Sequence, residues 1–438
     1  MEKEPATAVS RRKFIGQAST ALSAFLIVPR FVLGGRGYRA PSDMITLGFI
    51  GTGKQSRGLS RQFLTTGETR ILAAAEVYKA KRQLFIDQVK TFYTSEAGQG
   101  KGTYTDIQLY DDFRQLLDRK DIDAVVIVTP DHWHAVMAVK AAEAGKDIYC
   151  EKPLSLTVRE GRAMVQAARK HNRVFQTGSM QRSWPEFRQT AELIRNGYLG
   201  DIKMIKVNVG GPPKPYTLQG EPVPEGLDWS AWLGPNEPKP FSTELAPPLS
   251  QDVFPNWRNY KEFGGGGVTD WGAHMFDIVQ WSLDMDNSGP VEVIPPDGRE
   301  HKFLTYRYAS GITMTHEPWE WSNAIQYVGT EGTLNIQRRK LETTPTALKD
   351  RVIGNNDRRV YFSDNHYKDF LDAMRKRSKP ICDVEVGHRT ATVCNIGNIA
   401  YELKRPLRWD PKKESFKKDR EANALLERPL RDEWSIKV

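Results

Sequence analysis

Three side chains in this sequence have the types and spacing needed to move a proton at a hydroxyl group. Asp270 and His274 are four residues apart, and the apolar residues after them recur at helical spacing, which predicts that both side chains lie on one face of a helix. Histidine, whose ordinary pKa is about 6.5, is suited to accept a proton near neutral pH. Lys152 directly follows the short apolar segment 147–150, and an ammonium group there can hydrogen-bond the oxygen that loses its proton.

Each of these residues also has a purely structural interpretation. A lone buried histidine is more often a hydrogen-bonded member of the core, an aspartate can cap a helix, and a lone lysine is usually a solvated surface residue. The position of Lys152 argues for function, because ligands of open α/β sheets bind beyond the carboxyl ends of the strands. Four glycines at 264–267 precede Asp270 and allow a close approach of the backbone to a ligand or partner.

A strand, a glycine-containing turn and a helix are predicted near the start of the folded region. A mostly apolar run ends at Gly51, and Gly53, Lys54 and Gln55 follow before a helical pattern begins. In a dinucleotide-binding turn, the first glycine permits the tight bend and the second lets the backbone approach the pyrophosphate at the start of the helix. Ser56 stands where such a turn has its third glycine, which is a departure from the pattern.

A carboxylate follows this turn at the distance expected of a ribose-binding acid. Glu76 ends the next apolar run, roughly 20 residues after Gly53. A carboxylate there accepts hydrogen bonds from the 2′-hydroxyl and repels a 2′-phosphate, so the sequence favours NAD over NADP. Lys79 and Arg82 lie nearby in the sequence and could reverse this preference, so NADP remains an alternative. The structural alternative for Glu76 is an ordinary exposed acid at the end of a strand.

Strands and helices alternate over residues 43–178 without the signals of a β-hairpin. The sequence predicts a helix opening at 110–113, a strand at 123–130, a helix at 135–144, a strand at 147–150, a helix at 158–171 and a strand at 174–177. Such alternation is typical of an α/β domain with a doubly wound parallel sheet.

The pattern changes after this region. Segments 202–209, 302–308 and 324–328 alternate as amphipathic strands, and 329–332 has the composition of a hairpin turn. They predict a second α/β domain over residues 179–408 with an open, mostly antiparallel sheet. One face of that sheet is free to pack on another subunit, so we expect a homodimer or homotetramer.

A segment rich in proline and tryptophan, residues 211–258, lies within the second domain. Its tryptophans are Trp229, Trp232 and Trp257, and Tyr260 follows just after it. Aromatic rings can pack against the C–H faces of sugar rings, and Arg182 and Arg258, with Gln181 and Asn256, could bond sugar hydroxyls. Arg182, Trp257 and Arg258 are therefore candidate substrate-binding residues. The alternative is that these rings only close a small core of the loop itself.

Four segments together resemble the Gfo/Idh/MocA family, the family of glucose-fructose oxidoreductase and inositol dehydrogenase. They are the glycine loop at 51–58, Thr129-Pro130-Asp131-His132-Trp133-His134, Glu151-Lys152-Pro153, and Gly264-Gly265-Gly266-Gly267-Val268-Thr269-Asp270-Trp271-Gly272-Ala273-His274. Their order and spacing agree with the family from about residue 43 to residue 408. The resemblance implies an N-terminal Rossmann domain that binds NAD(P) and a C-terminal α/β domain that binds substrate and supports oligomerisation.

The resemblance also implies roles for individual residues. Lys152, Asp270 and His274 would form the catalytic set beside the nicotinamide. The other residues that it places beside the cofactor are Thr129, Pro130, His134 and Glu151, with His132 lining the same cleft and Trp133 packing behind it. Asp131, His132 and His134 could instead ligate a metal ion, but the sequence offers no further ligand at a fixed spacing, so we expect no metal site.

Composition and charge exclude several classes of protein. The formal net charge of +9 comes from residues 1–40 and 404–438, and the intervening chain is close to neutral, which argues against a nucleic-acid-binding face. No apolar run reaches the roughly 18–20 residues of a membrane-spanning helix. The three cysteines have no C-x-x-C spacing and indicate neither a disulfide framework nor a structural zinc site.

Both ends of the chain have distinctive sequences. Ser10-Arg11-Arg12-Lys13-Phe14 precedes the weakly apolar segment 21–33, which predicts that residues 1–40 are a twin-arginine export signal and that the protein works in the periplasm. A basic, disordered N-terminus is the alternative, since no clear A-x-A cleavage site follows. Export of a folded protein fits a cofactor enzyme without disulfides. Residues 409–438 are expected to form a basic, solvated tail.

Three functions remain open on the sequence alone. The first is an NAD(P)-dependent oxidoreductase that transfers a hydride between a secondary hydroxyl of a sugar or glycoside and a tightly held nicotinamide cofactor. The second is a redox-neutral, NAD-dependent cleavage of a glycoside by oxidation and elimination. The third is a catalytically silent sugar-binding protein, against which the joint presence of Lys152, Asp270 and His274 argues.

Overall fold

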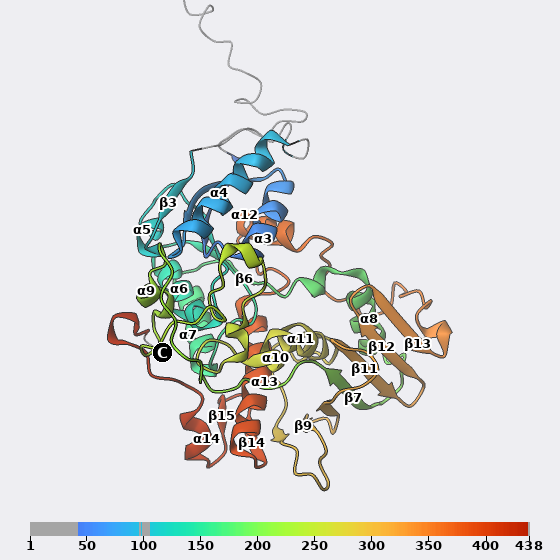
Figure 1. Cartoon of the computed structure of the whole chain (residues 1–438). Coiled ribbons are helices and arrows are strands. Elements are labelled where there is room, and N and C mark those ends of the chain that lie inside the picture. The colour runs from blue at the N-terminus through green and yellow to red at the C-terminus, as the bar shows by residue number, and fades with distance from the viewer. Residues whose placement is uncertain (1–42, 96–97, 99–105, 437–438) are drawn as a thin grey trace, which may run out of the picture.

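The computed structural model describes residues 43–95, 98 and 106–436. Two sheets with their covering helices form two domains that lie side by side (Figure 1). The predicted twin-arginine segment lies outside the described residues. None of the described helices is long and apolar enough to cross a membrane, and the three cysteines are buried free thiols.

The first sheet has six strands in the order β3-β2-β1-β4-β5-β6, and every pair is parallel. The strands are β1 (Ile45–Ile50), β2 (Thr69–Ala75), β3 (Gln108–Tyr110), β4 (Ala124–Ile127), β5 (Asp147–Cys150) and β6 (Phe175–Thr177). The helices between them are α3 (Lys54–Thr65), α4 (Lys79–Thr94), α5 (Phe113–Leu117), α6 (Asp131–Glu143) and α7 (Val158–Lys170). The chain reverses direction across the sheet between β1 and β4, where ligands of doubly wound sheets bind.

Helices cover both faces of this sheet, because its central strands are apolar on both sides. On one face, Leu59 and Phe63 of α3 pack with Phe85 of α4. Phe370 of α12 (His366–Lys376) joins this cluster, although α12 belongs to the C-terminal half of the chain. α5, α6 and α7 cover the other face. The predicted doubly wound parallel sheet is confirmed.

The second sheet has nine strands in the order β13-β12-β11-β7-β10-β9-β8-β14-β15. Its members are β7 (Ile202–Asn208), β8 (Glu292–Ile294), β9 (Leu304–Arg307), β10 (Thr313–His316), β11 (Ala324–Gly329), β12 (Thr333–Gln337), β13 (Lys340–Thr344), β14 (Leu407–Asp410) and β15 (Ser415–Phe416). The named pairs are antiparallel except β7 with β10. The predicted mostly antiparallel sheet is therefore confirmed.

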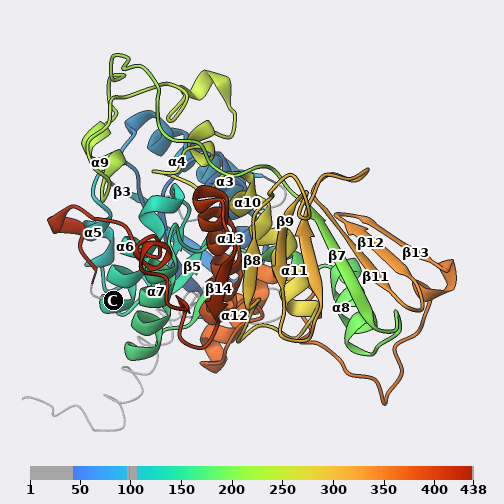
Figure 2. The ribbon, with the colours of Figure 1, turned by 90° about the horizontal axis from the view of Figure 1, so that it is seen from below.

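Helices pack on one face of the second sheet (Figure 2). The helices of this half of the chain are α8 (Pro185–Arg195), α9 (Trp229–Leu233), α10 (Gly266–Asp270), α11 (Gly272–Ser282), α12, α13 (Val384–Leu403) and α14 (Arg420–Ala424). Short 3-10 helices are η3 (Met180–Ser183), η4 (Leu249–Gln251), η5 (Asn256–Asn259), η6 (Thr346–Leu348) and η7 (Asp432–Trp434). On the opposite face of β7 and β12, side chains such as Met204, Lys206 and Asn335 remain at least partly exposed.

The C-terminal residues do not form the solvated tail that the lysine-rich sequence predicts. β14, β15 and α14 fold onto the second sheet, and η7 returns to the first domain. The Trp434 ring lies 4.8 Å from the Trp133 ring and 6.0 Å from the Phe113 ring. The lysines at 412, 413, 417 and 418 are exposed, but Glu414 and Phe416 between them are buried, so composition alone gave a wrong prediction here.

Candidate active site

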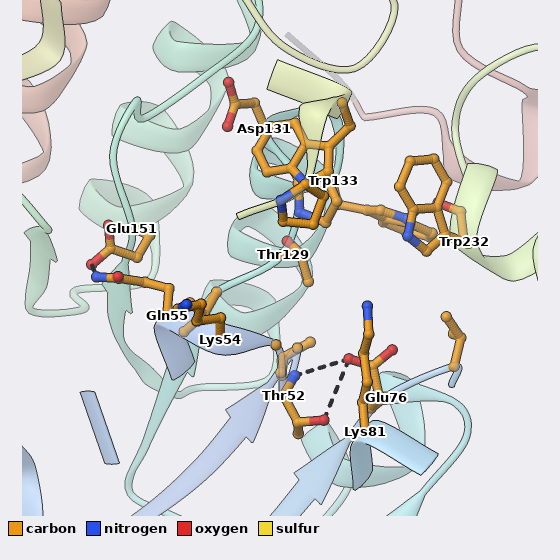
Figure 3. Close-up of a pocket in the computed structure, with 18 of the residues that line it drawn as sticks. Thr52, Lys54, Gln55, Glu76, Lys81, Thr129, Asp131, Trp133, Glu151 and Trp232 are labelled. Atoms are coloured by element: carbon orange, nitrogen blue, oxygen red, sulfur yellow. Dashed lines mark hydrogen bonds between the residues drawn. The ribbon is translucent and has the colours of Figure 1, made fainter. Parts of the chain in front are cut away.

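A cavity of about 630 Å³ opens beyond the carboxyl ends of the parallel strands. Its walls come from the turn after β1, the start of α6, the junction between α10 and α11, and the proline-rich segment 245–258. Figure 3 shows the part of this cavity that lies between the glycine turn and the Trp133 and Trp232 rings. The cavity therefore occupies the place where the sequence predicts a dinucleotide and a substrate.

The glycine turn has the geometry that a bound pyrophosphate requires. Gly51 has a φ of +86°, and a Cβ there would lie 2.7 Å from the Val128 carbonyl oxygen, so only glycine fits without strain. Gly53 is the N-cap of α3, has no side chain to cap the helix, and a Cβ there would meet nothing within 4 Å. The free amide groups at the start of α3 can bind an anion in that space. Ser56 is fully buried and does not line the cavity.

Glu76 lines the cavity and also supports the glycine turn. Its Oε2 accepts a hydrogen bond from the Thr52 backbone N–H at 2.9 Å, drawn in Figure 3, and its Oε1 accepts one from the Tyr78 N–H at 3.0 Å. Of the nearby basic residues, Lys79 is exposed. Arg82 donates to the Glu76 carbonyl oxygen at 3.0 Å.

Lys81, which the sequence interpretation overlooked, is the basic residue that reaches the cavity beside Glu76 (Figure 3). Burial lowers the pKa of Lys81, and the Glu76 carboxylate opposes this shift. A carboxylate and an ammonium therefore share this end of the cavity, where a ribose hydroxyl can bond either group.

The segment 245–258 crosses the glycine turn from the second domain. The Asp252 carboxylate lies 3.4 Å from the Lys54 ammonium and also pairs with Arg57. The Phe254 ring packs under the Lys54 ammonium at 5.3 Å. We call residues 245–258 the strap. The sequence did not predict the position of the strap, because the strap has no helical or strand pattern. Only its proline and aromatic content distinguished this region.

Lys152 and Asp270 lie together at the end of the cavity that Arg258 and His274 also line. The Lys152 Nζ donates to the Asp270 Oδ1 at 2.6 Å and to the Asp270 carbonyl oxygen at 2.8 Å. The Arg258 Nε lies 3.5 Å from the same Oδ1. Burial alone would raise the pKa of Asp270, but Lys152 and Arg258 outweigh it and lower that pKa. Asp270 is thus held as a carboxylate that orients two cations.

His274 faces the same end of the cavity. The predicted single helix is interrupted, because α10 ends at Asp270 and α11 begins at Gly272, with Trp271 between them. Burial, helped by the charges of Lys152 and Arg338, lowers the pKa of His274 well below its usual value. The imidazole is therefore neutral at pH 7, and its buried Nδ1 has no hydrogen-bond partner among the described residues.

Thr129, Pro130 and Glu151 line the cavity, but His134 does not. The two ring nitrogens of His134 lie 2.9 Å from the Pro153 carbonyl oxygen and 3.0 Å from the Thr129 carbonyl oxygen. Both nitrogens face these backbone oxygens behind the cavity wall, so His134 positions the Thr129 loop. The expectation that His134 lies beside the cofactor is therefore not met.

No group of His, Cys, Asp or Glu in the described part of the chain has the arrangement of a metal site. His132 lies 3.1 Å from the Trp232 carbonyl oxygen, and burial lowers its pKa to about 3 and that of His134 to about 4. Asp131 instead lines the cavity, and burial raises its pKa to about 8. A protonated carboxyl group at neutral pH is a feature that the sequence did not reveal.

Trp257 and Arg258 line the cavity, but Arg182 does not. Arg182 is fully buried and makes ion pairs at 2.8 Å with both Asp277 and Asp286. Its guanidinium group is engaged by these two carboxylates, so its assignment to substrate binding is corrected.

The aromatic residues of the 211–258 region divide between two roles. Trp229 stacks on Trp232 with 4.6 Å between ring centroids, and both belong to a small core with Tyr260 and Phe263. Trp257 has the Arg258 guanidinium over its ring at 4.2 Å and also faces the cavity. The loop does close its own core, and Trp232 and Trp257 contribute to the cavity wall as well.

Comparison with known proteins agrees with this geometry. Residues 45–179 match the family described as the oxidoreductase family, NAD-binding Rossmann fold, and residues 212–436 match its C-terminal alpha/beta domain. The chain belongs to the Gfo/Idh/MocA oxidoreductase family. Its first domain is accordingly an NAD-binding domain, and the open turn at Gly53 fits that cofactor.

Individual relatives share only parts of the chain. Levoglucosan dehydrogenase of Pseudarthrobacter phenanthrenivorans is 32% identical over 171 residues, 39% of this chain and 35% of that protein. Glycosyl hydrolase family 109 protein 1 of Shewanella sp. (strain MR-4) is 29% identical over 167 residues, 38% of this chain and 35% of that protein. The chain spans about half or less of the length of several curated relatives that it matches.

The fold is shared over a longer stretch. The crystal structure of aldose-aldose oxidoreductase from Caulobacter crescentus, complexed with glycerol, superposes with a TM-score of 0.55 at 18% identity. The superposition covers 83% of this chain and 99% of that one. This likeness shows a common two-domain fold.

Proposed function

We propose that the protein is an NAD-dependent oxidoreductase that transfers a hydride between a secondary hydroxyl of a sugar or glycoside and its nicotinamide cofactor. The observation that carries the proposal is the convergence of Lys152, Asp270 and His274 on one end of a cavity whose other end holds the glycine turn. NAD, when bound, supplies the hydride acceptor. The sugar dehydrogenases among the relatives support the choice of substrate class.

The three polar residues have distinct tasks in this proposal. His274, neutral at pH 7, takes the proton from the hydroxyl as the C–H bond breaks. The Lys152 ammonium donates a hydrogen bond to the oxygen and stabilises its growing negative charge. Asp270 holds the Lys152 ammonium in place at 2.6 Å.

The strap supports tight retention of the cofactor. It covers the glycine turn and is joined to Lys54 and Arg57 through Asp252, so release of a dinucleotide requires this contact to open.

We further propose export by the twin-arginine route to the periplasm, on the sequence of residues 10–14. Retention fits that location, since soluble cofactor is scarce outside the cytoplasm. The open face of the second sheet fits a homodimer or homotetramer.

A second candidate is glycoside cleavage by oxidation followed by elimination. Asp131 favours it, because its pKa of about 8 leaves a protonated carboxyl group in the cavity that can donate a proton to a leaving group. A curated relative named as a glycosyl hydrolase points the same way. In this cycle the hydride returns to the sugar, so no net oxidation occurs.

The first experiment is to denature purified protein, prepared without added cofactor, and assay the supernatant for NAD and NADP by mass spectrometry. Retained NAD, together with keto-sugar formed from aryl glycosides, supports the dehydrogenase, whereas released aglycone supports the cleavage reaction. Lys152→Ala should abolish turnover in either case. Failure of the protein to bind NAD or NADP would exclude both, and sugar binding without turnover in wild type and Lys152→Ala would favour a silent binding protein.

A further inference from the structure

One cation at the catalytic end of the cavity has no carboxylate partner. Arg338 lies in the hairpin between β12 and β13 and reaches the cavity wall that also contains Trp271 and His274. Among the residues that the structure describes, no aspartate or glutamate makes an ion pair with it. The nearby cations Lys152 and Arg258, in contrast, both contact the Asp270 carboxylate.

Neutral neighbours hold the Arg338 side chain in a fixed direction. Its Nε donates a hydrogen bond to the Gln181 Oε1 at 2.9 Å. Its guanidinium lies 4.7 Å from the centroid of the Trp271 ring and 5.5 Å from that of the Trp184 ring. These contacts engage the Nε and the flat face of the group, and they provide no negative charge for the two terminal nitrogens.

The charge balance of this end of the cavity points to an anionic ligand. Lys152, Arg258 and Arg338 are cations, whereas the acidic groups at this end are Asp270, Glu151 and Asp131. Burial raises the pKa of Glu151 and raises that of Asp131 to about 8, so the negative charge does not balance the positive charge. Burial lowers the pKa of Arg338 against the opposing influence of Asp270 and Glu151, which shows that the group is partly removed from water. Partial burial of an uncompensated charge is unfavourable unless a ligand supplies the counter-charge.

We propose that Arg338 binds a carboxylate of the substrate, so that the enzyme acts on a sugar acid, such as a hexuronic acid or its glycoside. This inference rests on the proposed sugar-oxidising function and names the class of sugar. The terminal nitrogens of a guanidinium match the two oxygens of a carboxylate, and the charge excess at this end is positive. A neutral sugar would leave that partly buried charge unpaired, so the same residue discriminates against neutral sugars.

The test is calorimetric binding to the full-length protein, with and without NADH, of three matched pairs: glucuronate and glucose, galacturonate and galactose, mannuronate and mannose. We expect at least one acid to bind about 10-fold or more tightly than its neutral partner, since a charge-assisted hydrogen bond is stronger than one between neutral groups. Arg338→Gln should abolish this preference, and Arg338→Lys should retain part of it. Arg339→Gln removes the same charge from the exposed neighbouring position and should change nothing.

The contrary outcomes are distinct. If no acid binds more tightly than its neutral partner, or if Arg338→Gln and Arg338→Lys, verified as folded by circular dichroism, both keep the full preference, the inference is wrong. If glucose 6-phosphate binds more tightly than every uronate, the group that Arg338 binds is a phosphate, and the inference of a carboxylate is wrong. Oxidation of neutral sugars alone would overturn this inference and leave the proposed function standing. Binding of uronates without any binding of NAD would support this inference and contradict the proposed function.

Discussion

At the scale of single residues, burial and the surrounding charges determine the pKa of His274. Burial and the positive groups of Lys152 and Arg338 all disfavour the imidazolium form. A proton acceptor must be unprotonated before it can act, and here that form is already present at neutral pH.

We predict that oxidation of the hydroxyl does not show an acid limb near pH 6.5. Because the pKa of His274 is lowered, kcat/KM should stay level as the pH falls from about 8 to about 6, and decline only at lower pH. Arg338→Gln removes one of the positive charges and should move the acid limb to higher pH. The measurement is a pH profile of the rate at which subsaturating sugar reduces the bound NAD. A wild-type limb at or above pH 6.5 would contradict the role of His274.

Arg182 supplies a prediction about stability. Arg182→Leu should destabilise the fold by about 3–5 kcal/mol, because it leaves Asp277 and Asp286 without their buried counter-charge. Arg61→Leu, on the exposed surface of α3, should stay within about 0.5 kcal/mol. Urea unfolding of both variants measures the difference. A stable Arg182→Leu variant with weakened sugar binding would restore Arg182 as a substrate ligand.

At the scale of elements, the glycine run before Asp270 has a packing role. A Cβ on Gly267 would overlap Gly210, and one on Gly266, whose φ is +70°, would lie 2.5 Å from the Pro213 nitrogen. The glycines thus allow the start of α10 to pack closely against the chain segment that follows β7. It fixes the start of α10 and with it the position of Asp270.

We predict opposite effects for the same substitution at two glycines. Gly267→Ala should cost about 1–3 kcal/mol through overpacking and should lower kcat as Asp270 shifts. Gly58→Ala, at an exposed position of α3 with nothing within 4 Å of the new Cβ, should stabilise the protein by about 0.4–1 kcal/mol. Thermal unfolding and steady-state kinetics measure the two effects. Equal stability of the two variants would mean that α10 can move away freely.

At the scale of the whole molecule, a partly buried ion network joins the domains. Arg162 of α7 pairs with Glu385 of α13 at 2.8 Å and with Glu414 beyond β14 at 2.6 Å. His388 lies 2.7 Å from Glu414. Although burial opposes the shift, Arg162 lowers the pKa of Glu385 to about 2 and also lowers that of Glu414.

This network should make stability depend on pH in the acid range. A carboxylate with a lowered pKa stabilises the fold fully above its unfolded pKa of about 4.5, and that contribution is lost as the pH falls from there toward about 2. Arg162→Gln should therefore lower the melting temperature at pH 7 and weaken its dependence on pH below about 4.5. Arg405→Gln, which breaks a more exposed pair with Asp419, is the control and should have little effect. Identical acid profiles for wild type and Arg162→Gln would contradict this assignment.

The sequence predicted those features that depend on local pattern. The alternation of apolar strands and helices identified the parallel sheet, and the glycine turn with Glu76 located the nucleotide end of the cavity. Arg182 and His134 were misassigned because their partners, Asp277 and the Pro153 carbonyl, are contacts of the folded chain. Arg338 was missed for the same reason: nothing in its local sequence shows that the hairpin reaches the cavity.

The cavity wall holds an unusual number of indole rings, contributed by Trp133, Trp232, Trp257, Trp271 and Trp434. The emission of an excited indole overlaps the absorption band of a reduced nicotinamide, so light absorbed by these rings can pass to NADH bound among them. The intrinsic tryptophan fluorescence should therefore report whether NADH is bound. Ultraviolet excitation would reveal a retained, reduced cofactor by quenched tryptophan fluorescence and blue emission, without a label and before any substrate is known.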